Sequence, residues 1–253
     1  MATEPSSHSA DEQPSKAETA RALENVRAIV EQHLGPYMKQ QTEGFSRVTN
    51  LLAVAREAEQ SDALVRLTEH CKLNATQDIL RAAVVLIHAQ LEEFLRTMAR
   101  TLLPEGDEGC LNEIPLAGLG GRKDRFLLGK LAQHRGKMVD EVLRASVSEY
   151  LERSNYNSTT EIANLLRTLG FDVPEHDNQF AEIEQMIERR HKIVHRADRF
   201  EDANSALALQ PIAINDVADW LRATQEFLNS LRIPLFAKLI GAKPTRSSTQ
   251  PGP

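Results

Sequence analysis

The sequence predicts an all-α fold, and three observations support this prediction. Apolar residues recur at helical spacing along most of the 253-residue chain. Runs of β-branched residues are short, and the alternation of apolar and polar residues that marks a strand is absent. No internal repeat of fixed period is found. The expected architecture is therefore a helical core with an inserted helical segment.

Three helical segments are expected before the centre of the bundle. The first covers residues 17–33 and ends at Gly35-Pro36, and the second covers residues 45–59. Ser61 and the aspartate after it offer a cap for a third.

The strongest helix is expected over residues 76–103. The Pro-Glu-Gly sequence that starts at Pro104 ends it. So much apolar surface on one helix indicates the centre of a bundle. The residues of this wide apolar face are Ile79, Leu80, Ala83, Val84, Ile87, Leu91, Phe94, Leu95 and Met98.

A long loop separates this helix from the next ones. Residues 104–124 are rich in Gly and Pro and lack the spacing of a phosphate-binding loop. Helices are then expected at about 125–134 and 138–153.

The last three expected helices have clear boundaries or faces. Ser158 as N-cap, with Glu161 three positions later, forms a capping box, and Gly170 ends the helix that follows. Another helix covers residues 178–197, and the last long one covers residues 215–232.

We divide the chain into four parts on this pattern. The tails, residues 1–16 and 241–253, have the composition of disordered segments. Residues 17–75 form an N-terminal helical region, and residues 76–240 form the main helical domain.

Composition limits the function classes. The formal charge of −6 argues against coating nucleic acid by bulk charge, although local phosphate contacts remain open. The longest apolar stretch, Ala82 to Ala89, is far shorter than the roughly 20 residues of a membrane span. The N-terminus has no secretory signal, and two cysteines form no disulfide framework. We therefore expect a soluble, cytoplasmic protein.

The stretch "RRHKIVHRADRF" over residues 189–200 is the densest basic cluster and admits three interpretations. One is a metal site, because His191 and His195 are four apart and share a helix face. Lys192 weakens it by placing a cation where a metalloprotease helix has its glutamate, and a third ligand would have to be Glu92 or His88. Another is a solvated helix end, where basic residues suit the helix dipole.

The third interpretation pairs Arg190 with His195 for RNA cleavage without metal. The step between them turns about 140° around a helix and rises about 7.5 Å, so both can reach one groove. Histidine can take the proton of a 2′-hydroxyl or protonate the leaving oxygen. An arginine fork can hold the scissile phosphate.

Three segments resemble HEPN domains. "RHKIVHRAD" resembles the HEPN signature of an arginine, a polar residue, an apolar pair and a histidine near a helix end. "VVLIHAQLEEFLRTMA" resembles the first core helix of the larger HEPN families. "SNYNSTTEIANLLRTLGFDV" is similar to the segment before the motif helix in RiboL-PSP and MAE_28990 types. The resemblance covers about residues 76–232, and residues 1–75 show none.

The resemblance implies a bundle of four or five helices that dimerises with its motif helices facing each other. Many such domains are metal-independent endoribonucleases of toxin–antitoxin or anti-phage defence systems, and they need no cofactor. It implies that Arg190 clamps the phosphate and that His195 is the general acid or base. His191 fills the polar position of the signature, and Glu92 is the acidic residue that orients the pair. RNA, a second copy and an antitoxin or effector protein are the partners implied.

Four further basic residues are expected to bind RNA phosphates: Arg189, Lys192, Arg196 and Arg199. Asp198 is expected to pair with one of them. The competing hypothesis is a non-catalytic HEPN module that mediates assembly or binds nucleotide or RNA, in which residues 1–75 and the tails engage a partner.

Overall fold

The fold is all-α, as predicted. The computed structural model describes residues 30–61, 69–117, 128–173, 178–200 and 208–241, and five single positions between residues 21 and 28. Within these ranges every named element is a helix, and the only strand-like contact is an isolated antiparallel bridge between Arg199 and Leu209. The predicted disordered tails fall largely outside the described residues.

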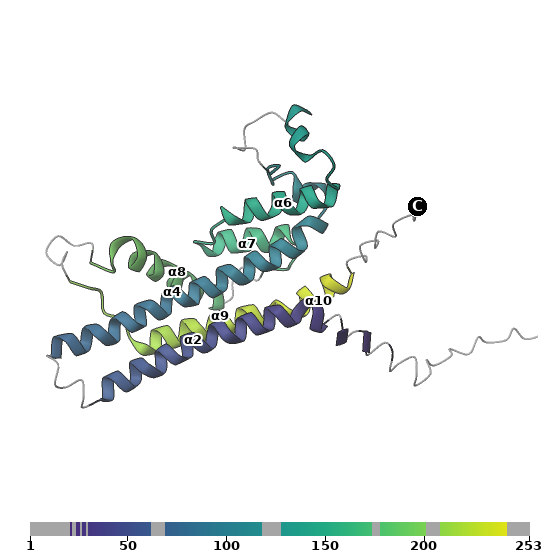
Figure 1. The fold of residues 1–253 in the computed structure, drawn as a ribbon. Helices are drawn as coiled ribbons and strands as arrows, with labels where there is room; N and C mark the ends of the chain where they lie inside the picture. The colour runs from purple at the N-terminus through teal and green to yellow at the C-terminus, as the bar shows by residue number, and fades with distance from the viewer. Residues whose placement is uncertain are drawn as a thin grey trace, which may run out of the picture.

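Two long helices form the spine of the molecule. Helices α2 (Gly35–Gln60) and α4 (Glu69–Leu102) pack side by side along most of their length, as Figure 1 shows. Gly44 is buried where they approach, and a Cβ there would lie 1.8 Å from the Gln90 side-chain oxygen. A glycine on one helix therefore makes room for a glutamine on the other.

The prediction that Gly35-Pro36 ends a helix is wrong. The chain passes from a π-helical turn, η1 (Val30–Leu34), directly into α2, which starts at Gly35 with Pro36 in its first turn. Proline is tolerated there because the first turn needs no donor at that position. The helix expected from residue 45 thus begins ten positions earlier. Ser61 ends α2 as its C-cap, and the third segment expected after it falls mainly on residues 62–68, outside the described ranges.

Helix α4 is the central helix, as predicted from its apolar face. Eight of the nine predicted face residues are buried, and the ninth, Ile79, is partly buried against the same core. The helix begins at Glu69, earlier than expected, and a short 3-10 turn, η2 (Leu103–Glu105), follows it. The predicted domain boundary between residues 75 and 76 thus lies inside one helix, and α2 shares the core of α4.

Shorter helices follow in the middle of the chain. The expected loop after α4 contains α5 (Glu108–Leu111), and the described part of the helix expected at 125–134 is a 3-10 helix, η3 (Leu128–His134). Helices α6 (Val139–Glu152) and α7 (Thr159–Thr168) then pack beside the C-terminal half of α4 (Figure 1).

The predicted caps of α7 are largely confirmed. The Ser158 hydroxyl accepts a hydrogen bond from the Glu161 N–H at 3.2 Å, while the Glu161 carboxylate accepts from the Asn157 N–H at 2.7 Å. Gly170 has φ of +69°. The Phe171 N–H bonds the Leu166 carbonyl at 2.9 Å, which closes a Schellman motif.

The C-terminal third holds α8 (Asn178–Arg196), α9 (Ile214–Ser230) and α10 (Arg232–Gly241). The first two match the predicted ranges to within two residues, whereas α10 was not predicted. Its Pro234 lies in the first turn, and Leu235 is fully buried. Helix α8 packs against both α4 and α9. No helix in the described ranges is long and apolar enough to cross a membrane.

Candidate functional site at the end of helix α8

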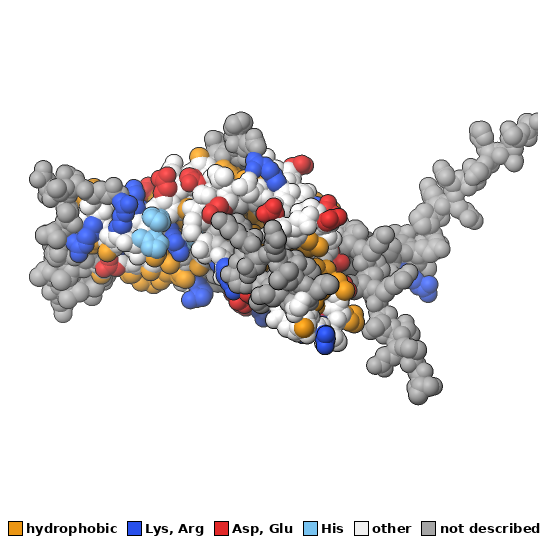
Figure 2. Space-filling model, turned by 90° about the horizontal axis from the view of Figure 1, so that it is seen from above, with side chains coloured by type: hydrophobic (Ala, Val, Ile, Leu, Met, Phe, Trp, Pro, Cys, Tyr) orange, Lys and Arg blue, Asp and Glu red, His pale blue; other side chains and the backbone are white. Residues whose placement is uncertain are grey.

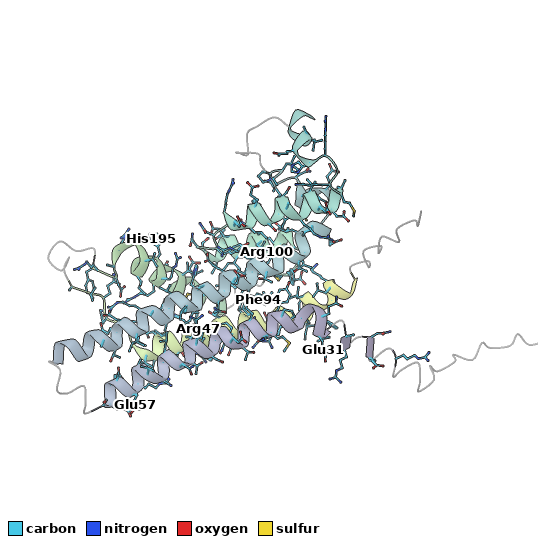
Figure 3. The ribbon with its side chains drawn as sticks, in the orientation of Figure 1. Glu31, Arg47, Glu57, Phe94, Arg100 and His195 are labelled. Carbon is cyan, nitrogen blue, oxygen red and sulfur yellow. The ribbon has the colours of Figure 1, made fainter. Side chains whose placement is uncertain are left out.

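The two motif residues lie on the last two turns of α8. His195 is exposed on the side of α8 that faces away from α2, as the label in Figure 3 shows. Arg190 is half-buried at the edge of the same helix. His191 is exposed one turn before His195, and the centroids of the two rings are 4.6 Å apart. Figure 2 shows the histidines on this face with Lys and Arg side chains around them.

The backbone after α8 makes a sharp turn. Ala197 and Asp198 have φ of +48° and +57°, the left-handed region that non-glycine residues seldom adopt. The Asp198 N–H bonds the Lys192 carbonyl at 3.0 Å. The Gln210 N–H donates to the Asp198 carbonyl at 2.8 Å, and the Phe200 N–H donates to the Ala208 carbonyl at 3.2 Å. The segment before α9 therefore holds the end of α8 in place.

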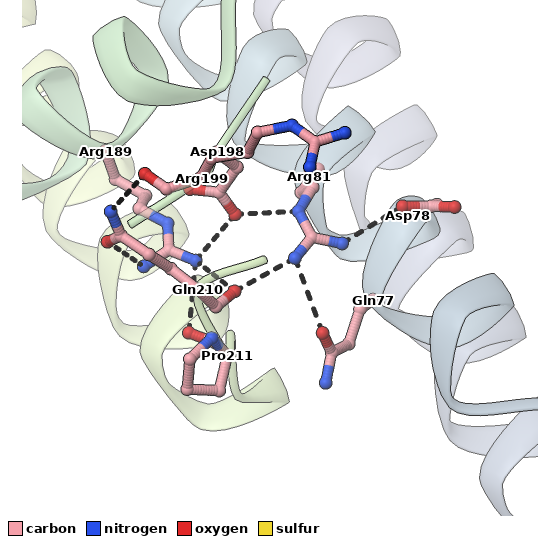
Figure 4. Close-up of polar contacts among 8 residues, drawn as sticks. All are labelled: Gln77, Asp78, Arg81, Arg189, Asp198, Arg199, Gln210 and Pro211. Atoms are coloured by element: carbon pink, nitrogen blue, oxygen red, sulfur yellow. Dashed lines mark hydrogen bonds and ion pairs between the residues drawn. The ribbon is translucent and has the colours of Figure 1, made fainter. Parts of the chain in front are cut away.

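A buried ion-pair network anchors this turn, and Figure 4 shows it in close-up. The Asp198 side chain is completely buried, and its Oδ2 accepts from Arg81 Nε at 2.7 Å and from Arg189 Nη2 at 2.8 Å. Arg81 also donates to Asp78 at 3.0 Å and to the Gln210 carbonyl at 2.9 Å. The predicted pairing of Asp198 with a neighbouring basic residue is confirmed, and its partner is Arg189.

Arg189 is directed into the protein. Besides Asp198, its guanidinium donates to the carbonyls of Gln210 and Pro211, at 2.9 and 3.0 Å. We expected this residue to hold RNA phosphate, but these donors hold the turn together instead. Arg81 was not expected at the site at all. A single arginine inside the apolar run of residues 79–87 was its only sequence signal.

Arg190 acts electrostatically on His88 of α4. The structure lowers the pKa of His88, mainly because burial disfavours its charged form, while Glu92 acts in the opposite direction. The positive charge of Arg190 contributes to the lowering. The Nε of Arg190 is buried and has no hydrogen-bond partner among the described residues. The Arg190 side chain is thus half-buried on α8, whereas the Arg189 side chain points into the buried ion-pair network.

His88 is a buried histidine with a backbone partner. Its side chain is 1% exposed, its Nε2 lies 3.1 Å from the Tyr156 carbonyl, and its Nδ1 lies 3.8 Å from a Glu92 oxygen. Glu92 in turn accepts from the Tyr156 N–H at 3.3 Å and lies 3.8 Å from Arg96. The partners found for the Glu92 carboxylate therefore lie on α4 and at Tyr156.

The remaining predicted residues lie on the surface around His195. Lys192 is half-buried, and Arg196 and Arg199 are exposed. Two apolar side chains are also exposed here, Val194 at 47% and Phe200 at 39%. The end of α8 thus presents basic and apolar groups together.

The metal interpretation with a third ligand is wrong within the described residues. No group of three or more His, Cys, Asp or Glu side chains there could hold an ion. His88, proposed as that ligand, is buried with its Nε2 on the Tyr156 carbonyl, and Glu92 is turned toward the Tyr156 N–H and Arg96.

Comparison with known proteins identifies a family. The family described as RiboL-PSP-HEPN matches residues 50–233. No curated protein and no solved structure matches the chain. The matched range starts inside α2, well before the segments whose resemblance was visible in the sequence, and it contains the whole of α4, α8 and α9. Because this range covers more than half of the chain, the protein belongs to the RiboL-PSP-HEPN family.

Proposed function

We propose that the protein is a metal-independent endoribonuclease in which Arg190 and His195 carry the reaction. One observation carries the proposal: in a member of a HEPN family, both signature residues stand on the last two turns of one anchored helix, with His195 open to solvent. If no cleavage is found, the competing hypothesis of a non-catalytic binding module holds.

The proposed reaction uses the 2′-hydroxyl of RNA as nucleophile. The 2′-oxygen attacks the adjacent phosphorus while the bond from phosphorus to the 5′-oxygen breaks. This leaves a 2′,3′-cyclic phosphate and a free 5′-hydroxyl. His195 takes the proton of the attacking hydroxyl or delivers one to the leaving oxygen. DNA has no 2′-hydroxyl, so the mechanism selects RNA.

Arg190 is suited to bind the phosphate. The lowered pKa of His88, to which the charge of Arg190 contributes, means that His88 adds no positive charge that would compete with Arg190 near pH 7. The guanidinium stands at the half-buried edge of the helix, where solvent screens a charge less than on an open surface. The planar guanidinium fork matches phosphate oxygens and stabilises the charge that develops on them.

The surrounding cations would bind the flanking phosphates. Lys192, Arg196 and Arg199 lie on the helix end and on the turn after it, around His195. Contacts of this kind position the strand without reading its sequence. His191 would contribute a donor next to the scissile group.

We further propose that two copies join through the ends of their α8 helices. Val194 and Phe200 are exposed apolar side chains beside His195. A second copy that covers them would bring two Arg190–His195 pairs to one interface. An activity of this kind would slow cell growth on expression, and a neutralising partner protein would restrain it.

The test is an RNase assay in EDTA with purified protein. Wild type is expected to cleave RNA, and the His195→Ala and Arg190→Ala variants are expected to lose cleavage with unchanged folding. His134→Ala, a histidine outside the site, is the matched control and should cleave like wild type. If wild type leaves RNA intact and does not slow growth on expression, the protein is a binding module.

A further inference from the structure

We infer that His191 and His195 form a two-histidine site for Zn²⁺, and that the bound ion switches the proposed cleavage off. The inhibitory role depends on the proposed function, whereas the metal site does not. Such an ion would occupy the acid–base group and take no part in the reaction.

The ring geometry supports this site. The two side chains are four residues apart on α8, and their ring centroids are 4.6 Å apart with 45° between the ring planes. Zinc lies about 2.0–2.1 Å from an imidazole nitrogen, so two rings that share one tetrahedral ion have centroids roughly 5 Å apart. Small rotations of two exposed side chains are therefore enough to bind one ion.

The donor set selects the kind of ion. Two neutral imidazoles suit Zn²⁺ and its neighbours Ni²⁺ and Cu²⁺, and do not suit Mg²⁺ or Ca²⁺, which prefer oxygen ligands. No third metal-binding side chain joins the pair among the described residues, so the other coordination positions would hold water. Lys192 and Arg196 add positive charge nearby, which limits the affinity.

Metal binding and proton transfer exclude each other at His195. A coordinated imidazole has given its lone pair to the ion and can no longer accept a proton from the 2′-hydroxyl. The same exposed ring therefore serves either the proposed reaction or the ion. Removal of zinc would restore cleavage.

The first experiment measures binding without any activity. Purified chain, stripped with EDTA and dialysed, is titrated with ZnCl₂ in a calorimeter, with MgCl₂ as the ion control. We expect His191→Asn and His195→Asn each to weaken zinc binding about tenfold or more, since each removes one arm of a chelate. His134→Asn should bind zinc like wild type. Unchanged binding in the double variant H191N/H195N would overturn the site.

The second experiment adds zinc to the RNase assay. Cleavage seen in EDTA should fall as zinc occupies the pair and return with renewed chelation. Full cleavage at saturating zinc would overturn the inhibitory role. If no cleavage occurs in EDTA but the double variant loses zinc binding, the metal site stands, and the proposed function fails together with the inhibitory role.

Discussion

Two adjacent arginines on α8 have different surroundings because one helical step turns the side chain by about 100°. Arg189 enters the buried network with Asp198, while Arg190 is half-buried and its Nε has no hydrogen-bond partner among the described residues. The sequence alone could not separate them, since both belong to the same basic run. The Asp198 carboxylate that binds Arg189 also accepts from Arg81, which lies on another helix more than a hundred residues away.

Replacing the two arginines should therefore have different effects on cleavage and on thermal stability. Arg190→Ala is expected to reduce cleavage about 10²- to 10³-fold, the usual effect of removing one group that stabilises developing charge. Its thermal unfolding midpoint should stay close to that of wild type. Arg189→Ala is expected to lower that midpoint clearly. Equal losses of stability in the two variants would contradict this division.

Asp198 is the residue on which the network depends. Asp198→Ala removes the one carboxylate that faces both Arg81 and Arg189 and leaves Arg81 buried without it. We expect a loss of about 3–5 kcal/mol in unfolding free energy, as for other buried pairs that lose one partner. Urea unfolding measures it. Asp219→Ala, which breaks an exposed pair with Arg222, is the control and should cost less than about 1 kcal/mol.

His88 gives stability a pH dependence. Its pKa in the folded protein is lowered from 6.5, mainly by burial. The unfolded chain therefore binds a proton at a pH where the folded chain does not, and stability falls as pH drops below about 6.5. Urea unfolding at a series of pH values should show this slope. In the His88→Gln variant the slope should become shallower; an identical slope would show that His88 is not its source.

At the scale of the element, the long amphipathic helices were predictable, but the positions where α2 and α10 begin were not. The apolar face of α4 and the caps of α7 are local patterns, and both are present in the structure. Pro36 was misleading because proline in a first turn and proline after a last turn look the same in a sequence, and the same ambiguity applies to Pro234 in the first turn of α10. Only the packing of α2 and α10 against the core decides between them.

The contact of α2 with α4 should be sensitive at Gly44. Gly44→Leu places a large side chain where the Gln90 side chain lies, and overpacking of this kind costs about 1–3 kcal/mol. Adding Gln90→Ala should recover part of that loss. Chemical denaturation of the single and double variants tests this coupling, and purely additive effects would contradict it.

For the whole molecule, the sequence predicted the class and the HEPN core but not its extent. Residues before 76 showed no resemblance, yet the family match begins at residue 50 and α2 packs along α4. The reason is physical: α2 contributes mainly small and apolar core residues, among them Val48, Leu52 and Ala55, which carry no recognisable chemistry.

The proposed dimer is tested at the same scale. Val194→Asp with Phe200→Asp should convert a dimer into a monomer and abolish cleavage, because charge would enter the apolar contact. Ile233→Asp, at an apolar residue that is 81% exposed on α10, is the control and should leave both properties unchanged. Analytical ultracentrifugation measures the mass of each variant. A wild-type protein that sediments as a monomer would contradict the proposed dimer.

The buried network also ties the motif helix to a segment that is synthesised after it. Arg81 and Gln210, which meet in it, are 129 positions apart, and residues 208–211 follow the motif helix in the chain. A chain still on the ribosome carries Arg190 and His195 before it carries the segment that anchors them. On the proposed function, a potentially harmful nuclease would stay inactive until residues 208–211 have joined the fold.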